Sequence, residues 1–182
     1  MVAIWFRGVL VLETDTKKDV ALLVIDVQHQ FMTQVPNAKD LLAKINVLLR
    51  KARCAGAPVV FIHHSPEHCS PVGDSPWAIH ESLPVEEQDI LVRKESPNAF
   101  HSTQLKEALD ARRINRLVMC GIATRFCVRA TLLGALSLGY EVIVAGDAHS
   151  SGDAACEATA REWNAKFAVI GATVIATEDI GF

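Results

Sequence analysis

Short, unbroken apolar runs recur along this chain, and they constrain its fold more than any other feature of the sequence. A strand buried on both faces of a parallel sheet reads as a continuous apolar run, whereas a half-exposed strand alternates apolar and polar residues. Glycine, proline or charged residues flank the runs. We therefore expect six strands, at Val20–Asp26, Val59–His63, Asp89–Lys94, Leu117–Cys120, Glu141–Ala145 and Ala172–Ala176.

Segments with helical periodicity separate these runs. The clearest helix is expected between Asn37, as its N-cap, and Gly56. Further helices are expected after Ser102 or Thr103, from Cys127 to a stop before Gly139, and from Asp153 to about Phe167. Alternating strands and helices predict an α/β protein, a three-layer α/β/α sandwich with a six-stranded, mostly parallel sheet of Rossmann-like order.

The domain organisation follows from length and from the first apolar run. A chain of 182 residues suits one domain with a sizeable core. We assign residues 20–182 to that domain and residues 1–19 to an N-terminal arm or extra strand. The apolar start MVAIWFRGVLVLE lacks a basic leading region and a small-residue cleavage site, so we do not interpret it as a signal peptide.

Charge and cysteine content narrow the class of partner. A net charge of −3 gives no reason to expect a nucleic acid or a membrane as partner. Five cysteines without a C-x-x-C pair describe neither a disulfide framework nor a four-cysteine zinc site, which favours a reducing cytoplasm. The first strand is followed by DVQHQF instead of a glycine-rich turn, so no dinucleotide cofactor is expected.

Three residues with complementary chemistry come at the ends of three predicted strands. Asp26 ends the first strand, Lys94 ends the third, and Cys127 lies where the fourth strand gives way to a helix. Ligands of open parallel sheets bind beyond the carboxyl ends of the strands, near the point where strand order reverses. We therefore expect these three side chains to meet at one edge of the sheet.

The three residue types can perform acyl transfer. The N-terminus of a helix stabilises a thiolate, which is the nucleophilic form of cysteine, and a buried Asp26 can serve as the base for Cys127. Lys94 would hold the thiolate electrostatically. A sharp turn after Gly121 can aim the amides of Ala123 and Cys127 at a developing oxyanion. The alternative is an Asp–Lys ion pair beside an uninvolved thiol.

The ordered motifs resemble the isochorismatase-like cysteine hydrolases, the superfamily that includes nicotinamidase and carbamoylsarcosine, biuret and ureidoacrylate amidohydrolases. The resemblance runs from Val20 almost to the end of the chain, through LLVIDVQHQF, VRKESPNAF, GIATRFCVRAT and GYEVIVAGDAHSS. It implies a six-stranded parallel sheet between helices, assembled as homodimers or homotetramers.

The resemblance also implies roles for particular residues. Asp26, Lys94 and Cys127 match the family's base, lysine and nucleophile. The bond between Ile122 and Ala123 matches its cis peptide, and the amides of Ala123 and Cys127 match its oxyanion hole. Isochorismatase itself cleaves a vinyl ether without a nucleophilic cysteine, so Cys127 favours hydrolysis of a C–N bond through a thioester.

One departure from the family pattern concerns a metal. The nicotinamidases carry an Asp-x-His metal motif after the second strand, where this chain has His63, His64 and Ser65. We therefore expect no metal and no other cofactor. His64, His68 and Cys69 are the alternative, because their side chains are of the types that bind zinc.

Other residues are candidates for the substrate pocket. Phe31 matches an aromatic wall of the family's pocket. Arg125 can pair with a substrate carboxylate, or it is solvated. Trp77 either closes the pocket or packs the long loop between Ser65 and Gln88. His149 is expected to be a structural histidine near the same edge, and no role follows for His29.

Together these features predict a cytoplasmic, cysteine-dependent hydrolase that cleaves a C–N bond of a small amide, carbamoyl or ureido compound. Two alternatives remain. One is a metal-assisted, nicotinamidase-like hydrolase, and the other is a small-molecule-binding or redox protein of the same fold that does not hydrolyse its ligand.

Overall fold

The computed structural model describes residues 2–6, 9–13, 19–66, 69–73 and 75–182, and its centre is a six-stranded sheet. The strand order is β5-β4-β3-β6-β7-β8, and every neighbouring pair is parallel. The strands are β3 (Val20–Ile25), β4 (Val59–His64), β5 (Ile90–Lys94), β6 (Arg116–Ile122), β7 (Glu141–Ser150) and β8 (Thr173–Ile175). The predicted fold class is confirmed.

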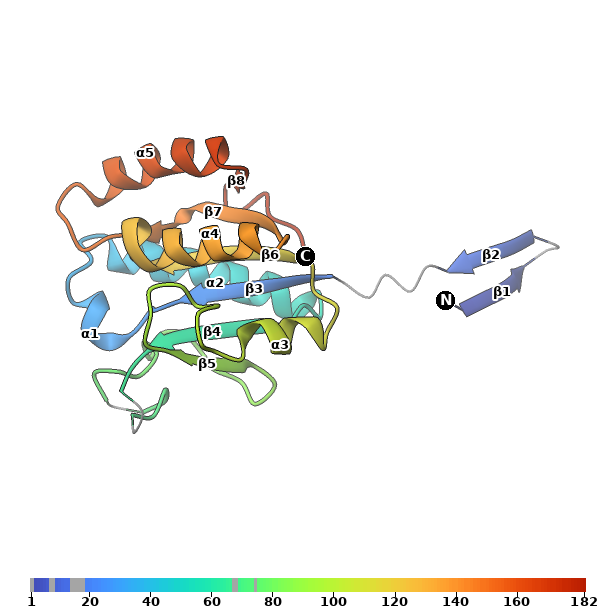
Figure 1. Cartoon of the computed structure of the whole chain (residues 1–182), viewed down its shortest axis with the longest axis horizontal. Helices are drawn as coiled ribbons and strands as arrows, with labels where there is room; N and C mark the ends of the chain where they lie inside the picture. Colours follow the sequence, from blue (N-terminus) through green and yellow to red (C-terminus); the bar gives the residue numbers. More distant parts are fainter. Residues whose placement is uncertain (1, 7–8, 14–18, 67–68, 74) are drawn as a thin grey trace.

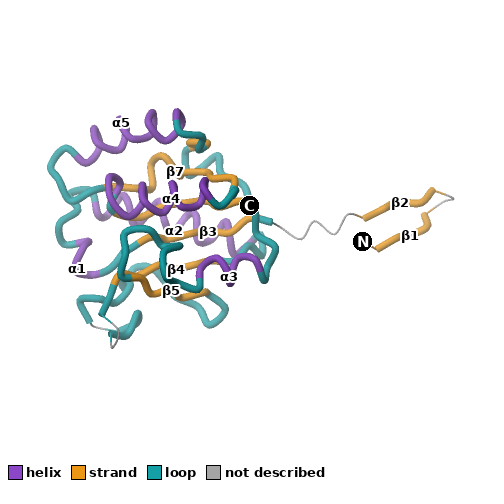
Figure 2. Tube along the Cα trace, viewed as in Figure 1, coloured by secondary structure: helices purple, strands orange, loops and turns teal. Residues whose placement is uncertain are grey.

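Helices cover both faces of this sheet (Figures 1 and 2). They are α1 (His29–Met32), α2 (Ala38–Cys54), α3 (Leu105–Asp110), the π-helical turn η1 (Thr124–Val128), α4 (Arg129–Ser137) and α5 (Cys156–Val169). Helix α2 packs on one face, whereas α3, α4 and α5 pack on the other. Figure 1 shows α3 and α4 in front of the sheet and α2 behind it.

The core is divided by the sheet into two apolar layers. In β3, Val20, Leu22 and Val24 face the α2 side, and the alternate residues of the strand face the opposite side. All six β3 residues are buried. This two-sided burial explains why the strand reads as an unbroken apolar run.

Helix α2 forms where its periodicity predicts, with Asn37 as its N-cap residue. Its buried residues recur at helical spacing, Asp40 lies in its first turn and Lys51 in its last. The Asn37 side chain makes no capping hydrogen bond. Its Oδ1 instead accepts a hydrogen bond from Ser150 Oγ at 2.7 Å, which ties the start of α2 to the end of β7.

Strand β7 is longer than its apolar run indicates. Met119 of β6 pairs with Val144, but Gly121 pairs with His149, so β7 contains additional residues between these two pairings. This irregularity carries β7 on to Ser150, beyond the predicted end at Ala145. It delivers a polar stretch to the edge of the sheet where β6 ends.

The strand order creates a switch point between β3 and β6. From β3 the chain adds β4 and β5 on one side, and then returns to add β6, β7 and β8 on the other. Crevices form at such points beyond the carboxyl ends of the strands. Asp26 follows β3 directly, and Cys127 follows β6 across this switch point.

The N-terminal strands β1 (Val2–Phe6) and β2 (Val9–Glu13) form a separate antiparallel pair. Residues 14–18 lie outside the described part of the chain, so the proposed boundary near residue 19 stays a prediction. Among the described residues, no helix combines the length and apolar character needed to span a bilayer.

Candidate active site

Cys127 lies in a compact turn between β6 and α4, which we call the cysteine turn (residues 122–128). The peptide bond between Ile122 and Ala123 is cis. The amides of Phe126 and Val128 then donate to the Ala123 carbonyl, at 2.9 and 3.2 Å, which forms the π-helical turn η1. Helical structure therefore begins at Thr124 instead of Cys127, and the sulfur belongs to the first turn.

Asp26 reaches the same place from β3. Its amide donates to the Ile62 carbonyl at 2.9 Å, which continues the ladder with β4. Its backbone φ of 51° then turns the chain out of the sheet. The residue is only 2% exposed, so its carboxylate is removed from bulk solvent.

Lys94 connects the other two side chains. It ends β5 and is 1% exposed. Its Nζ lies 2.8 Å from Asp26 Oδ2 and donates to Cys127 Sγ at 3.3 Å. One buried ammonium group therefore contacts both the carboxylate and the sulfur. The structure thus brings together the three residues that the sequence placed at strand ends.

Burial sets the protonation of this cluster. Desolvation, followed by the charge of Asp26, raises the pKa of the Cys127 thiol to about 12, although Lys94 opposes the shift. Desolvation also raises the pKa of Asp26, with Lys94 again opposing. Both shifts favour the protonated forms, so burial opposes the stabilised thiolate expected from the helix N-terminus. Asp26 with a raised pKa is a suitable acceptor for the thiol proton.

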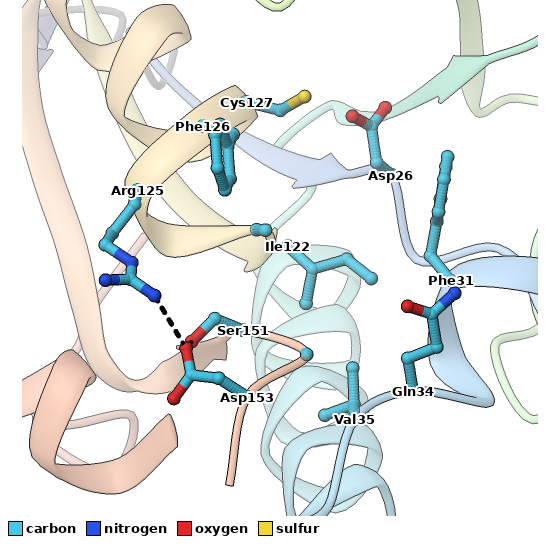
Figure 3. Close-up of a pocket in the computed structure, with 12 residues that line it drawn as sticks. Asp26, Phe31, Gln34, Val35, Ile122, Arg125, Phe126, Cys127, Ser151 and Asp153 are labelled. Carbon is cyan, nitrogen blue, oxygen red and sulfur yellow. Dashed lines mark hydrogen bonds and ion pairs between the residues drawn. The ribbon is translucent and has the colours of Figure 1, made fainter. Parts of the chain in front are cut away.

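A cavity of about 390 Å³ opens onto the cluster. Asp26 and Cys127 lie on its wall, and Figure 3 shows the sulfur directed toward the carboxylate. The other lining residues come from three separate segments: Phe31, Gln34 and Val35; Ile122, Ala123, Arg125 and Phe126; and Ser151, Gly152 and Asp153. The lining is mostly apolar, with polar groups confined to a few positions, as in small-molecule sites.

An ion pair between Arg125 and Asp153 forms a charged part of the cavity wall. Arg125 Nη2 lies 3.0 Å from Asp153 Oδ2 (Figure 3). Asp153 also accepts hydrogen bonds from Ser151 Oγ at 2.9 Å, the Ala155 amide at 3.0 Å and Thr159 Oγ1 at 3.4 Å. These donors occupy both carboxylate oxygens. The other N–H groups of Arg125 have no hydrogen-bond partner among the described residues.

Of the three residues predicted to form the substrate pocket, two line the cavity. Phe31 and Arg125 line the cavity, whereas Trp77 does not. The Trp77 carbonyl accepts a hydrogen bond from Gln28 Nε2, which also donates to the His64 carbonyl. Gln28 is fully buried and thereby ties the long loop to the end of β4. The Trp77 backbone therefore takes part in holding this loop in place.

Several cavity residues were missed in the sequence. Phe126 adjoins the nucleophile candidate and is 66% exposed, so its position in the turn was an available signal. Ser151 and Asp153 follow β7, whose end the apolar run placed too early. Gln34 and Val35 follow the short helix α1, which has no periodicity long enough to detect.

Metal-type donors gather at a different place. Within the described residues, the group of three that can converge on one ion is His29, His80 and Glu81. His29 Nδ1 lies 3.0 Å from Glu81 Oε2, and the Ser82 amide donates to His80 Nδ1 at 3.2 Å. None of these residues lines the cavity. Of the alternative zinc set, His64 and Cys69 are absent from this group, and His68 lies outside the described residues.

Fold and site together define a doubly wound α/β protein with a buried Asp–Lys–Cys cluster opening into a cavity at the switch point of its sheet. A family model described as the isochorismatase domain matches residues 20–179. The chain therefore belongs to the isochorismatase family, which confirms the resemblance seen in the sequence.

Individual relatives support the same assignment. A streptothricin hydrolase from Streptomyces noursei is 38% identical over 142 residues, covering 73% of this chain and 50% of the relative. A ureidoacrylate amidohydrolase from Stutzerimonas stutzeri is 28% identical over 176 residues, covering 74% of this chain and 71% of the relative. The chain spans about half the length of the streptothricin hydrolases it matches.

A solved structure shows the shared fold. The crystal structure of a cysteine hydrolase from Pseudomonas syringae pv. phaseolicola superposes with a TM-score of 0.80 at 23% identity. It covers 90% of this chain, and this chain covers 91% of it.

Proposed function

We propose that the chain is a cysteine-dependent hydrolase that cleaves the C–N bond of a small amide, carbamoyl or ureido compound through a thioester intermediate. The observation that carries the proposal is the contact of one buried ammonium group, Lys94 Nζ, with both Asp26 and Cys127 on the wall of a cavity. Relatives named as an amidohydrolase and as a streptothricin hydrolase support the reaction class.

The first half of the reaction forms the thioester. Asp26 accepts the thiol proton of Cys127 as the sulfur attacks the substrate carbonyl carbon. The carbonyl oxygen becomes an oxyanion, which the amides of Ala123 and Cys127 are proposed to bind. The C–N bond then breaks as Asp26 returns the proton to the leaving nitrogen, which departs as ammonia or an amine.

The second half releases the acid. Asp26 takes a proton from a water molecule, whose oxygen attacks the thioester carbonyl. The C–S bond breaks, and the proton on Asp26 returns to the Cys127 sulfur. The Lys94 ammonium group stabilises whichever partner, carboxylate or thiolate, bears the negative charge.

The cavity favours a compact substrate with an apolar part. Phe31, Val35 and Ile122 offer the apolar wall, and Phe126 contributes an exposed ring. Arg125 offers free N–H donors to a carbonyl or carboxylate group on the substrate. We propose that the reacting carbonyl lies at Cys127 and a polar group at Arg125.

Assembly and location form part of the same proposal. We propose a homodimer or homotetramer, as the resemblance implies, which light scattering measures directly. We also propose a cytoplasmic location, which is supported by five cysteines that are all free thiols.

The decisive experiment combines a substrate panel with detection of the intermediate. Small primary amides, carbamoyl compounds and ureido compounds are assayed for ammonia release, and the reacting enzyme is quenched for mass spectrometry. We expect an acyl adduct on Cys127. Cys127→Ala should lower turnover at least about 10³-fold, because it removes the nucleophile.

Cys54→Ala is the matched control, because Cys54 is an exposed free cysteine remote from the cavity lining. It should retain full activity. Undiminished turnover by Cys127→Ala, or an adduct only on another cysteine, would overturn the proposal.

A further inference from the structure

A buried hydrogen-bonded chain lies behind the cysteine turn, away from the cavity. Thr124 Oγ1 lies 2.9 Å from His149 Nδ1, and His149 Nε2 lies 2.7 Å from Asn164 Oδ1. Thr124 is 0% exposed and His149 is 2% exposed. Neither His149 nor Asn164 lines the cavity, so the mechanism above does not use them.

Asn164, at the far end of this hydrogen-bonded chain, determines which ring nitrogen of His149 carries a hydrogen. Asn164 Nδ2 donates to the Gly146 carbonyl at 2.8 Å, which directs the amide oxygen toward His149. An amide oxygen only accepts hydrogen bonds, so His149 Nε2 must be the donor. Burial lowers the pKa of His149, which favours the neutral ring. His149 Nδ1 is then an acceptor, and the Thr124 hydroxyl donates to it.

The hydrogen-bonded chain from Thr124 to Asn164 joins three elements that approach each other only in the folded protein. Thr124 belongs to η1, His149 to β7 and Asn164 to α5. The irregular register of β7 places His149 opposite Gly121, at the start of the cysteine turn. The direction of each hydrogen bond is therefore set from α5, through β7, to the turn that carries the sulfur.

We propose that His149 and Asn164 are positioning residues for the reaction. Asn164 fixes the tautomer of His149, and His149 fixes the Thr124 hydroxyl, which holds the cysteine turn so that the Cys127 sulfur and the amides of Ala123 and Cys127 face one carbonyl group. The positioning role rests on the proposed function, whereas the tautomer and the hydrogen-bond directions do not.

The tautomer is tested without any substrate. Protein labelled with the heavy isotope of nitrogen in histidine is examined by long-range proton–nitrogen NMR at neutral pH. We expect the His149 resonances to show a protonated Nε2 and an unprotonated Nδ1, and Asn164→Leu to abolish this single form. A protonated Nδ1 in the unaltered protein would overturn the assigned tautomer of His149 and, with it, the proposed positioning role.

The positioning role is tested by two matched pairs of variants. His149→Asn can keep an acceptor near the position of Nδ1, where the Thr124 hydroxyl donates. His149→Gln instead keeps a donor near the position of Nε2. We therefore expect His149→Asn to retain more activity than His149→Gln. Thr124→Val removes the hydroxyl and Thr124→Ser keeps it. For the best substrate of the panel, we expect Thr124→Val to lower kcat about tenfold with KM within about twofold, and Thr124→Ser to restore kcat.

Thr177→Val controls for the loss of a buried hydroxyl. Thr177 is 1% exposed, and its Oγ1 donates at 2.7 Å to Oδ1 of Asp147, a residue of β7. Neither residue lines the cavity. It should lower the melting temperature without changing kcat. Equal kcat in Thr124→Val and Thr124→Ser would overturn the positioning role. Full turnover by Cys127→Ala would instead refute the proposed function and leave the NMR result standing.

Discussion

At the scale of single residues, the site is a balance between burial and charge. Burial and the negative charge of Asp26 raise the pKa of Cys127, while the positive charge of Lys94 lowers it. The two charged neighbours therefore act in opposite directions on the same thiol. A cysteine that rests as a thiol is protected from oxidation and alkylation and is activated only when its base can accept the proton.

This balance predicts opposite effects from two substitutions. Lys94→Met should raise the pKa of Cys127 further and slow its alkylation by iodoacetamide at pH 9 by about tenfold. Asp26→Asn should lower that pKa and speed the reaction. The rate at Cys127 is measured by peptide mass spectrometry as a function of pH.

Lys106→Met is the control, because Lys106 forms an exposed ion pair with Asp110 on α3. It should leave the alkylation rate of Cys127 unchanged. Alkylation that changes in the same direction in Lys94→Met and Asp26→Asn would contradict the electrostatic account.

Arg125 predicts a preference among substrates. Asp153 holds the guanidinium at 3.0 Å, and the other N–H groups of Arg125, beside the cavity, have no partner in the described part of the chain. Arg125→Gln should raise KM about tenfold for an amide that bears a carboxylate, because a charged hydrogen bond is lost, and should change KM little for its neutral methyl ester. Both values come from steady-state ammonia release.

Arg129→Gln is the matched control for this substitution. The Arg129 guanidinium lies over the Trp163 ring, 5.5 Å from its centroid, and Arg129 does not line the cavity. Its removal should affect the two substrates equally. An unchanged ratio of KM values in Arg125→Gln would show that Arg125 does not contact the substrate.

At the scale of elements, the close packing of β6 on β3 depends on Gly121. Its φ is +117°, and a Cβ at this position would lie 2.1 Å from the Ile25 carbonyl oxygen. The obstacle is backbone, which cannot rotate away. This position in β6, one residue before the cysteine turn, must therefore be glycine.

Gly121→Ala should lower the free energy of unfolding by at least about 3 kcal/mol, because it combines backbone strain with a steric clash. Gly139→Ala is the control, since Gly139 has a φ of +86° but nothing within 4 Å of an added Cβ. It should cost about 1 kcal/mol. Urea denaturation measures both, and equal losses would contradict the steric argument.

At the scale of the whole molecule, the six-stranded sheet and its two apolar layers are built from Val20 onward. The family match begins at the same residue. Asp19 still contributes to this unit, because its carbonyl accepts hydrogen bonds from the Asn115 and Arg116 amides at 2.9 Å. The folding unit should therefore include Asp19.

A variant that lacks residues 1–18 should fold and retain activity. Its melting temperature should lie within about 2 °C of the full chain, because no strand of the main sheet is removed. Calorimetry and the ammonia assay provide the measurements. Aggregation or a large loss of stability would assign residues 1–18 to the domain instead of an arm.

The order of amino acids is sufficient to locate the strands and the reactive side chains at their ends. A strand buried on both faces must be apolar throughout, so its first charged residue marks where it leaves the core. This local rule located Asp26, the charged end of the third predicted strand located Lys94, and the apolar run before Gly121 located the turn with Cys127. Parallel strands end at one edge of a sheet, so the sequence predicts that the three residues lie together.

Tertiary structure alone decided how those residues act. The pKa of Cys127 depends on burial and on two charges from other strands, and the cavity draws its wall from segments near positions 31, 125 and 151. The irregular register of β7, which brings His149 to the cysteine turn, leaves no periodic trace in the sequence. Periodicity reports only a residue's own element, whereas distances and acidities arise between elements that are remote along the chain.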